Sequence, residues 1–158
     1  MRWLVQPSTT GRVRPPIAIF LVSAALALAA FALQRLLAGG LSPTEVEAFY
    51  RGAEGAEPLS AAALWEEVHV GSFVYGFVLF MLASLAAVAP RLDGLRGALV
   101  GVAFVATLAD LFAPFAVAAR ADLGVLRVAT FVAASAAMWA LLGAVTLAQV
   151  HARRADRA

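Results

Sequence analysis

Long runs of apolar residues divide the chain into four segments, each long enough to cross a membrane. They lie at about residues 17–37, 69–89, 98–119 and 125–150. A hydrocarbon core about 30 Å thick needs roughly 20 helical residues, and every run supplies about that length. Turn-forming residues such as Gly39-Gly40 and Pro90 separate the runs. The pattern therefore predicts an all-α fold, an up-down bundle of four transmembrane helices.

The long polar connection at residues 41–67 lies between the first two runs. Ser42-Pro43-Thr44-Glu45 has the pattern of a capping box with proline at the first helical position, which predicts a short helix through about Arg51. A glycine-rich, acidic break follows at residues 52–58, and Ser60 can cap a further helix that continues into the membrane. We expect a short external helical hairpin between the first and second transmembrane helices.

The chain is expected to form one integral membrane domain over residues 1–158, because the other loops are too short for a separate soluble domain. The first run has an alternative interpretation as a cleaved signal peptide. The arm before it is basic, and Ala30-Phe31-Ala32 resembles a small-x-small cleavage site. The run is longer than the usual apolar stretch of about 7–15 residues, which favours a retained helix.

Composition supports this class and narrows the partners. Of the 158 residues, 63% are hydrophobic and 14% charged, against roughly 45–50% and about 25% in soluble domains. The absence of cysteine excludes thiolate catalysis, iron–sulfur clusters and cysteine-based zinc sites. No contiguous basic face indicates a nucleic-acid partner. The expected partners are the lipid bilayer and other membrane-protein subunits or further copies of the chain.

The arginines predict the orientation. The N-terminal arm, the turn at residues 90–97 and the C-terminal tail hold most of the twelve basic residues. The positive-inside rule then places both termini in the cytoplasm and the 41–67 connection outside. The alanine- and arginine-rich, lysine-free composition is typical of a bacterial source, so we expect a multi-pass protein of the bacterial inner membrane.

Asp110 lies near the middle of the third run, where a carboxylate is costly unless it is neutral, paired or hydrated. Pro114 has no N–H to donate to the Asp110 carbonyl, which leaves a second oxygen in need of a donor. Thr107 lies one turn earlier on the same face. We expect Asp110 to face the bundle interior, with Ser135 and Tyr75 as its partners on other helices.

Two roles for Asp110 stay open at this point: a hydrogen bond that locks the bundle, or a proton or cation relay. In the first case Asp110→Asn should be nearly silent, because an amide keeps both donor and acceptor capacity. In the second case the same change should preserve folding and abolish activity.

Glu66-x-x-His69 stands where the second run begins. Residues three apart share one helical face, so both groups could bind one metal ion, and His69 could ligate a haem. Di-metal four-helix bundles use two Glu-x-x-His units, and the second unit is missing here. The alternative is an interfacial histidine that is satisfied by water or by Glu66, in a protein without cofactor.

Residues 41–52, together with Leu64-Trp65-Glu66-Glu67-Val68-His69, resemble a group of small four-helix bacterial inner-membrane proteins. Members of that group have an acidic first external connection and a histidine at the start of helix two. They often carry His-x-His at that point, whereas this chain has Gly71 in the second position. The resemblance implies the fold and the membrane location, but no established activity.

Three classes of function follow from these features. The first is a non-enzymatic accessory or assembly subunit of a larger membrane complex. The second is a haem- or metal-binding electron-transfer protein that uses His69. The third is a small proton or cation transporter or channel that uses Asp110. No nucleophile–base pair is visible, so we expect no enzyme.

The arginine distribution yields a topological prediction. Reporter fusions at Glu54 should be active only outside the cytoplasm, and fusions at Arg96 only inside it. A reporter that places Arg96 outside would overturn the orientation.

Overall fold

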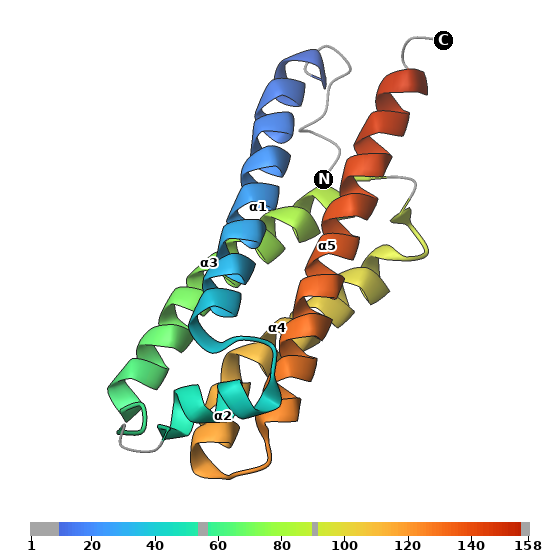
Figure 1. Ribbon diagram of the computed structural model, residues 1–158. Helices are drawn as coiled ribbons and strands as arrows, with labels where there is room; N and C mark the ends of the chain where they lie inside the picture. The colour runs from blue at the N-terminus through green and yellow to red at the C-terminus, as the bar shows by residue number, and fades with distance from the viewer. Residues whose placement is uncertain (1–9, 54–56, 90–91, 156–158) are drawn as a thin grey trace.

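The computed structural model describes residues 10–53, 57–89 and 92–155, and the regular structure in these ranges is helical. The helices are α1 (Thr10–Gly39), α2 (Pro43–Arg51), α3 (Ala61–Ala87), α4 (Arg96–Ala119) and α5 (Gly124–Ala155). All but α2 contain a segment long and apolar enough to cross a membrane. Figure 1 shows the four long helices as an elongated bundle with α2 lying across one end. The predicted all-α four-helix fold is confirmed.

The predicted hairpin is built from α2 and the first turns of α3. Ser60 caps α3 as expected, because its hydroxyl accepts a hydrogen bond from the Ala63 N–H at 3.2 Å. Ser42 occupies the N-cap position of α2, but the capping box does not form. The Ser42 hydroxyl instead contacts the Thr44 hydroxyl at 2.7 Å. The helix begins where the sequence predicts, with Pro43 as its first residue.

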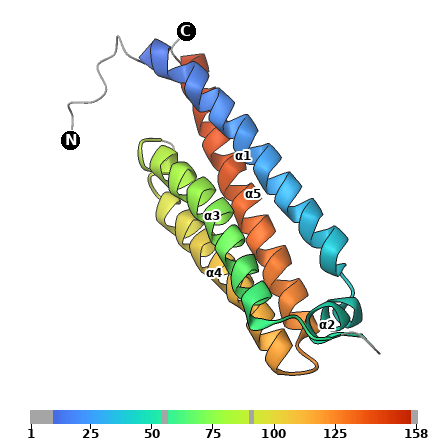
Figure 2. The same ribbon diagram turned by 90° about the vertical axis from the view of Figure 1, so that its left-hand side faces the viewer.

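The four long helices alternate in direction, so α1 begins and α5 ends on the side of the bundle opposite α2 (Figures 1 and 2). The most extensive helix pair is α4 with α5, and α3 packs against α4. The first helix contacts α3 and α5, while α2 crosses over α4 and α5. Figure 2 shows that α1 and α5 extend beyond the turn that joins α3 to α4.

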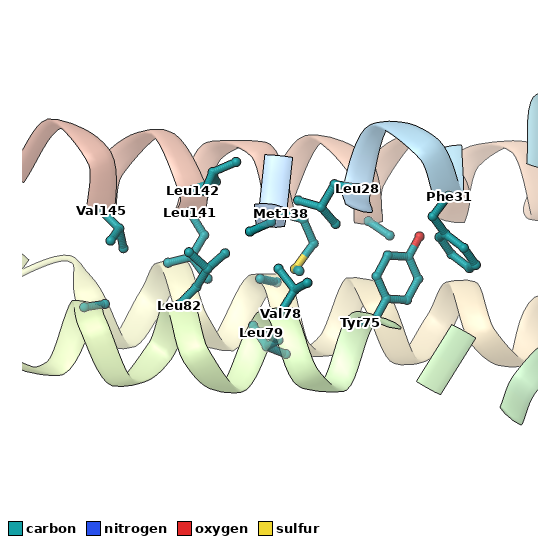
Figure 3. Packing of buried hydrophobic residues seen from close by; sticks show 14 of the residues in the cluster. Leu28, Phe31, Tyr75, Val78, Leu79, Leu82, Met138, Leu141, Leu142 and Val145 are labelled. Atoms are coloured by element: carbon teal, nitrogen blue, oxygen red, sulfur yellow. The ribbon is translucent and has the colours of Figure 1, made fainter. Parts of the chain in front are cut away.

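The half of the bundle away from α2 is filled by an apolar core. Leu82, Met138, Leu141 and Val145 have no exposed surface, and they interleave between α3 and α5 (Figure 3). Tyr75 lies at the edge of this core, beside Phe31 of α1, with ring centroids 5.0 Å apart. Burial of large apolar side chains gives this half its stability.

A smaller core joins α2 to the bundle. Val46 and Tyr50 of α2 are buried against Leu64 of α3 and Val117 of α4. Because α2 is amphipathic, it buries one face here while its acidic residues remain toward the surface. The external connection is therefore folded onto the end of the bundle, which places Tyr50 directly above the membrane helices.

Gly71 marks the closest approach of α3 to its neighbours. A Cβ atom at this position would lie 2.5 Å from Leu111 Cδ2 and 3.2 Å from Arg35 Nη2. Side chains of α4 and α1 therefore fill the space next to this position. A larger residue here would require the Leu111 and Arg35 side chains to move.

This close approach predicts that Gly71→Val destabilises the bundle by about 1–3 kcal/mol, since Leu111 and Arg35 must both move. Gly76→Val is the matched control on the same helix, because a Cβ atom there meets nothing within 4 Å. Denaturant unfolding in detergent compares the two variants. Equal stability of both would contradict the packing.

Candidate functional site: a buried charge network beneath α2

Asp110 of α4 is completely buried and forms an ion pair with Arg127 of α5. Arg127 Nη1 donates to Asp110 Oδ1, and the Tyr75 hydroxyl of α3 donates to Asp110 Oδ2 at 3.2 Å. The expectation that Asp110 faces the interior and contacts Tyr75 is confirmed. Its charge is neutralised by an arginine, which the sequence reasoning did not pair with it.

The other two predicted members of this group lie apart from the carboxylate. The Thr107 hydroxyl is buried but donates to carbonyls of its own helix, Ala103 at 2.8 Å and Phe104 at 2.9 Å. Ser135 is half-buried on α5, and among the described residues it is not a hydrogen-bond partner of Asp110. Arg127 takes its place, because a guanidinium supplies both a donor and a compensating charge.

Glu67 of α3 is the second acid of the network and connects three other helices. It forms an ion pair with Arg35 of α1 and accepts hydrogen bonds from the Tyr50 hydroxyl of α2, at 2.8 and 3.1 Å. Arg127 Nη2 lies 3.5 Å from the same carboxylate, and Arg127 Nε donates to the Tyr50 hydroxyl at 3.3 Å. Arg127 therefore links Asp110 to Glu67.

We call these six side chains the charge network, and they are Arg35, Tyr50, Glu67, Tyr75, Asp110 and Arg127. The charges of its two arginines and two carboxylates cancel. The four charged residues all lie inside candidate membrane spans. At 1.5 Å per residue, they are roughly 5–14 Å from the α2-side ends of their helices. Isolated charges at this depth are costly, and mutual pairing removes most of that cost.

Tyr50 holds α2 to the network as a hydrogen-bond donor. Its burial, and next the neighbouring Glu67 carboxylate, raise the pKa of the Tyr50 hydroxyl well above its usual value. The hydroxyl therefore stays protonated. Two further contacts fix the same helix: the Gly124 N–H donates to Glu47 Oε1 at 2.9 Å, and Arg51 Nη1 donates to the Ala118 carbonyl at 3.4 Å.

Arg35 has spare donor capacity. Its side chain is only 8% exposed, and its guanidinium carbon lies 4.7 Å from the centre of the Phe31 ring. Nη1 is bound to Glu67, whereas Nη2 is buried without a hydrogen-bond partner among the described residues. An unmade hydrogen bond of a buried charged group is unfavourable, so this nitrogen is a candidate for ligand contact or for a shift on binding.

A cavity of about 280 Å³ adjoins the network between α1, α2, α3 and α5. Its charged lining residues are Arg35, Glu66, Glu67 and Arg127, and its aromatic lining residues are Phe31, Phe49, Tyr50 and Phe131.

Several lining residues are exposed, and they locate the mouth of the cavity. Gln34 and Ala38 lie on α1, Glu66 and Val70 lie on α3, and Leu41 and Phe49 lie just before and on α2. The cavity therefore opens sideways between α1 and α3, and its opening extends to the end that α2 covers.

The predicted metal or haem pair, Glu66 and His69, lies on the exposed surface of α3. Both Glu66 and His69 are exposed, but only Glu66 belongs to the cavity lining. Glu47, on α2, accepts a hydrogen bond from the Gly124 N–H at the start of α5. In the part of the chain that the structure describes, no three His, Cys, Asp or Glu side chains are grouped closely enough to hold a metal ion.

The sequence reasoning missed Arg35, Glu67 and Arg127 as members of the site. In the sequence, both arginines stand near the ends of apolar runs and Glu67 ends the polar 41–67 connection, so none of the three stands out as a buried charge. Their charge and their depth in the membrane segments could have identified them, because a buried acid requires a cation at a similar level on a neighbouring helix.

A family model described as a transmembrane helical domain, Aq_1264_TM, matches residues 40–156. The match includes all of α2, α3, α4 and α5, and with them every member of the charge network except Arg35. Comparison with curated proteins and with solved structures gave no match.

The ion pair changes the prediction for Asp110. Asp110→Leu should lower the free energy of unfolding by about 3–5 kcal/mol, because Arg127 would remain buried without a counter-charge. Asp110→Asn should also destabilise, in contrast to the expectation for a neutral partner. The double variant Asp110→Leu/Arg127→Leu should recover most of the loss in the same unfolding assay. A double variant as unstable as the sum of its single variants would contradict a coupled pair.

Proposed function

The chain belongs to the Aq_1264_TM family of transmembrane helical domains, and from this premise we propose that it is a non-enzymatic accessory protein that holds a small, membrane-dissolved molecule in the cavity beneath α2. In this proposal it lies in the bacterial inner membrane with α2 on the outer side, and it works with other membrane subunits or a second copy.

The cavity is the observation that carries the proposal. Its volume of about 280 Å³ is close to the lower end of the roughly 300–1,000 Å³ found for small-molecule sites. Its walls are mainly apolar, with a few polar groups that converge at one end, which is the composition of such sites. The buried charge network fixes these polar groups in place, and rigid side chains make a better binding surface than mobile ones.

The sideways mouth supports a ligand that arrives from the bilayer. Gln34 and Val70 lie well inside their candidate membrane spans and are exposed at the mouth between α1 and α3. A molecule dissolved in lipid would reach this gap by lateral diffusion. A water-soluble ligand would have to enter beside α2, past the exposed apolar side chains of Leu41 and Phe49.

Binding is better supported than conduction. The buried polar residues in the described part of the chain are Thr107, Asp110 and Arg127, and they lie on the α2 side or near the middle of the bundle. The remaining half is closed by fully buried apolar residues such as Leu82 and Leu141. A relay through Asp110 would need polar groups or water across this half.

The proposal predicts that the purified protein carries a small molecule that a cavity-filling substitution removes. Ala63 lines the cavity, so Ala63→Trp should fill it, whereas Ala62 is exposed and outside the lining. Native mass spectrometry should find a bound mass of a few hundred daltons on the unmutated chain and on Ala62→Trp, but not on Ala63→Trp. Equal bound mass on both variants would exclude the cavity as the site.

A further inference from the structure

We propose that the ligand is a neutral, flat, carbonyl-bearing ring with an apolar chain, a molecule of the quinone class, and that Arg35 donates to its carbonyl oxygen. This inference rests on the proposed function, since it names the chemistry of the molecule held in the same cavity. It concerns binding alone.

The charges around the cavity favour a neutral ligand. Arg35 is paired with Glu67, and Arg127 with Asp110, so the buried groups already cancel. A charged ligand would place an uncompensated charge beside them at membrane depth, which is costly. Glu66 adds a negative charge only at the exposed mouth, where solvent and headgroups screen it. A neutral ligand leaves this balance intact.

The hydrogen-bonding capacity favours a carbonyl. Arg35 lines the cavity and retains a buried guanidinium nitrogen without a partner in the described part of the chain. A carbonyl oxygen can accept from a guanidinium without adding net charge. Hydrogen bonds to a charged donor are stronger than those between neutral groups, so this contact would orient the ligand. Arg127 is less available, because each of its three nitrogens already contacts a partner, namely Tyr50, Asp110 and Glu67.

The shape and lining favour a flat ring. Phe31, Phe49 and Phe131 come from α1, α2 and α5 and line the cavity from three directions. Aromatic side chains bind flat rings in edge-to-face and offset-stacked arrangements. The cavity admits a ring-sized head but not a long chain as well. The apolar chain would therefore extend through the gap between α1 and α3, past Ala38 and Val70, into the lipid.

Photolabelling of the full-length protein in phospholipid nanodiscs tests this inference. An azido-quinone should label peptides from the second half of α1 or from α2. An excess of decylubiquinone should suppress this labelling. Decanoate and decyltrimethylammonium have the same chain with an anionic or a cationic head, and neither should suppress it. If decanoate or decyltrimethylammonium suppressed labelling as strongly as decylubiquinone, the ligand would be an anion or a cation and the neutral class would be wrong.

Two variants assign the site to Arg35 and the cavity. Arg35→Lys keeps the charge opposite Glu67 but loses the planar donor fork, so the variant should still fold. The decylubiquinone concentration that half-suppresses labelling should rise about tenfold. Ala63→Trp should abolish labelling, and Ala62→Trp should leave it unchanged. An Arg35→Lys variant that competes as well as the unmutated protein would overturn the role of Arg35.

The experiments distinguish a failure of the quinone assignment from a failure of the proposed ligand-binding function. If a bound mass is lost from Ala63→Trp but decylubiquinone does not protect any peptide from labelling, the cavity binds a ligand of another class. Phospholipid ester carbonyls are then the alternative source of the acceptor, and the bound mass would identify them. Labelling that is insensitive to both tryptophan variants would overturn the quinone site itself.

Discussion

A carboxylate inside a membrane helix must be neutralised, and Glu67 meets this requirement through groups from three other helices. Arg35 of α1, Tyr50 of α2 and Arg127 of α5 all converge on it. The alternative for each group is an unpaired charge or hydroxyl near hydrocarbon, which is costly in free energy. This convergence joins α1, α2 and α5 to α3, and through Arg127 it reaches the ion pair at Asp110.

The same convergence explains why a cavity lies beside the network. Arg35 reaches Glu67 of α3 through the space that Gly71 leaves open, so a long side chain joins α1 to α3 at this level. The aromatic residues Phe31, Phe49 and Phe131 surround the remaining space. Electrical neutrality, spare donor capacity at Arg35 and a sideways mouth are therefore consequences of how the buried charges are satisfied.

The fold followed from the sequence because its determinants are local. Four apolar runs specify four long helices, and Ser60 and Pro43 define helix starts through contacts within a single turn. The site followed only in part. Asp110 and Tyr75 could be identified from depth and polarity, but the pairing of Asp110 with Arg127 depends on how α4 and α5 rotate against each other. The roles of Arg35 and Glu67 likewise depend on a contact between two helices. The two residues lie 32 positions apart in the chain, and local patterns do not specify such a contact.

Hydrogen–deuterium exchange of α2 in phospholipid nanodiscs tests the central claim, that the charge network ties this short helix to the membrane bundle. Residues 43–51 should be protected nearly as well as α4 in the unmutated protein, because Tyr50 is held by Glu67 and Arg127. Tyr50→Phe removes only the hydroxyl, and it should accelerate exchange in α2 while leaving α4 unchanged. Rapid exchange of α2 in the unmutated protein, or equal exchange with and without the hydroxyl, would contradict this account.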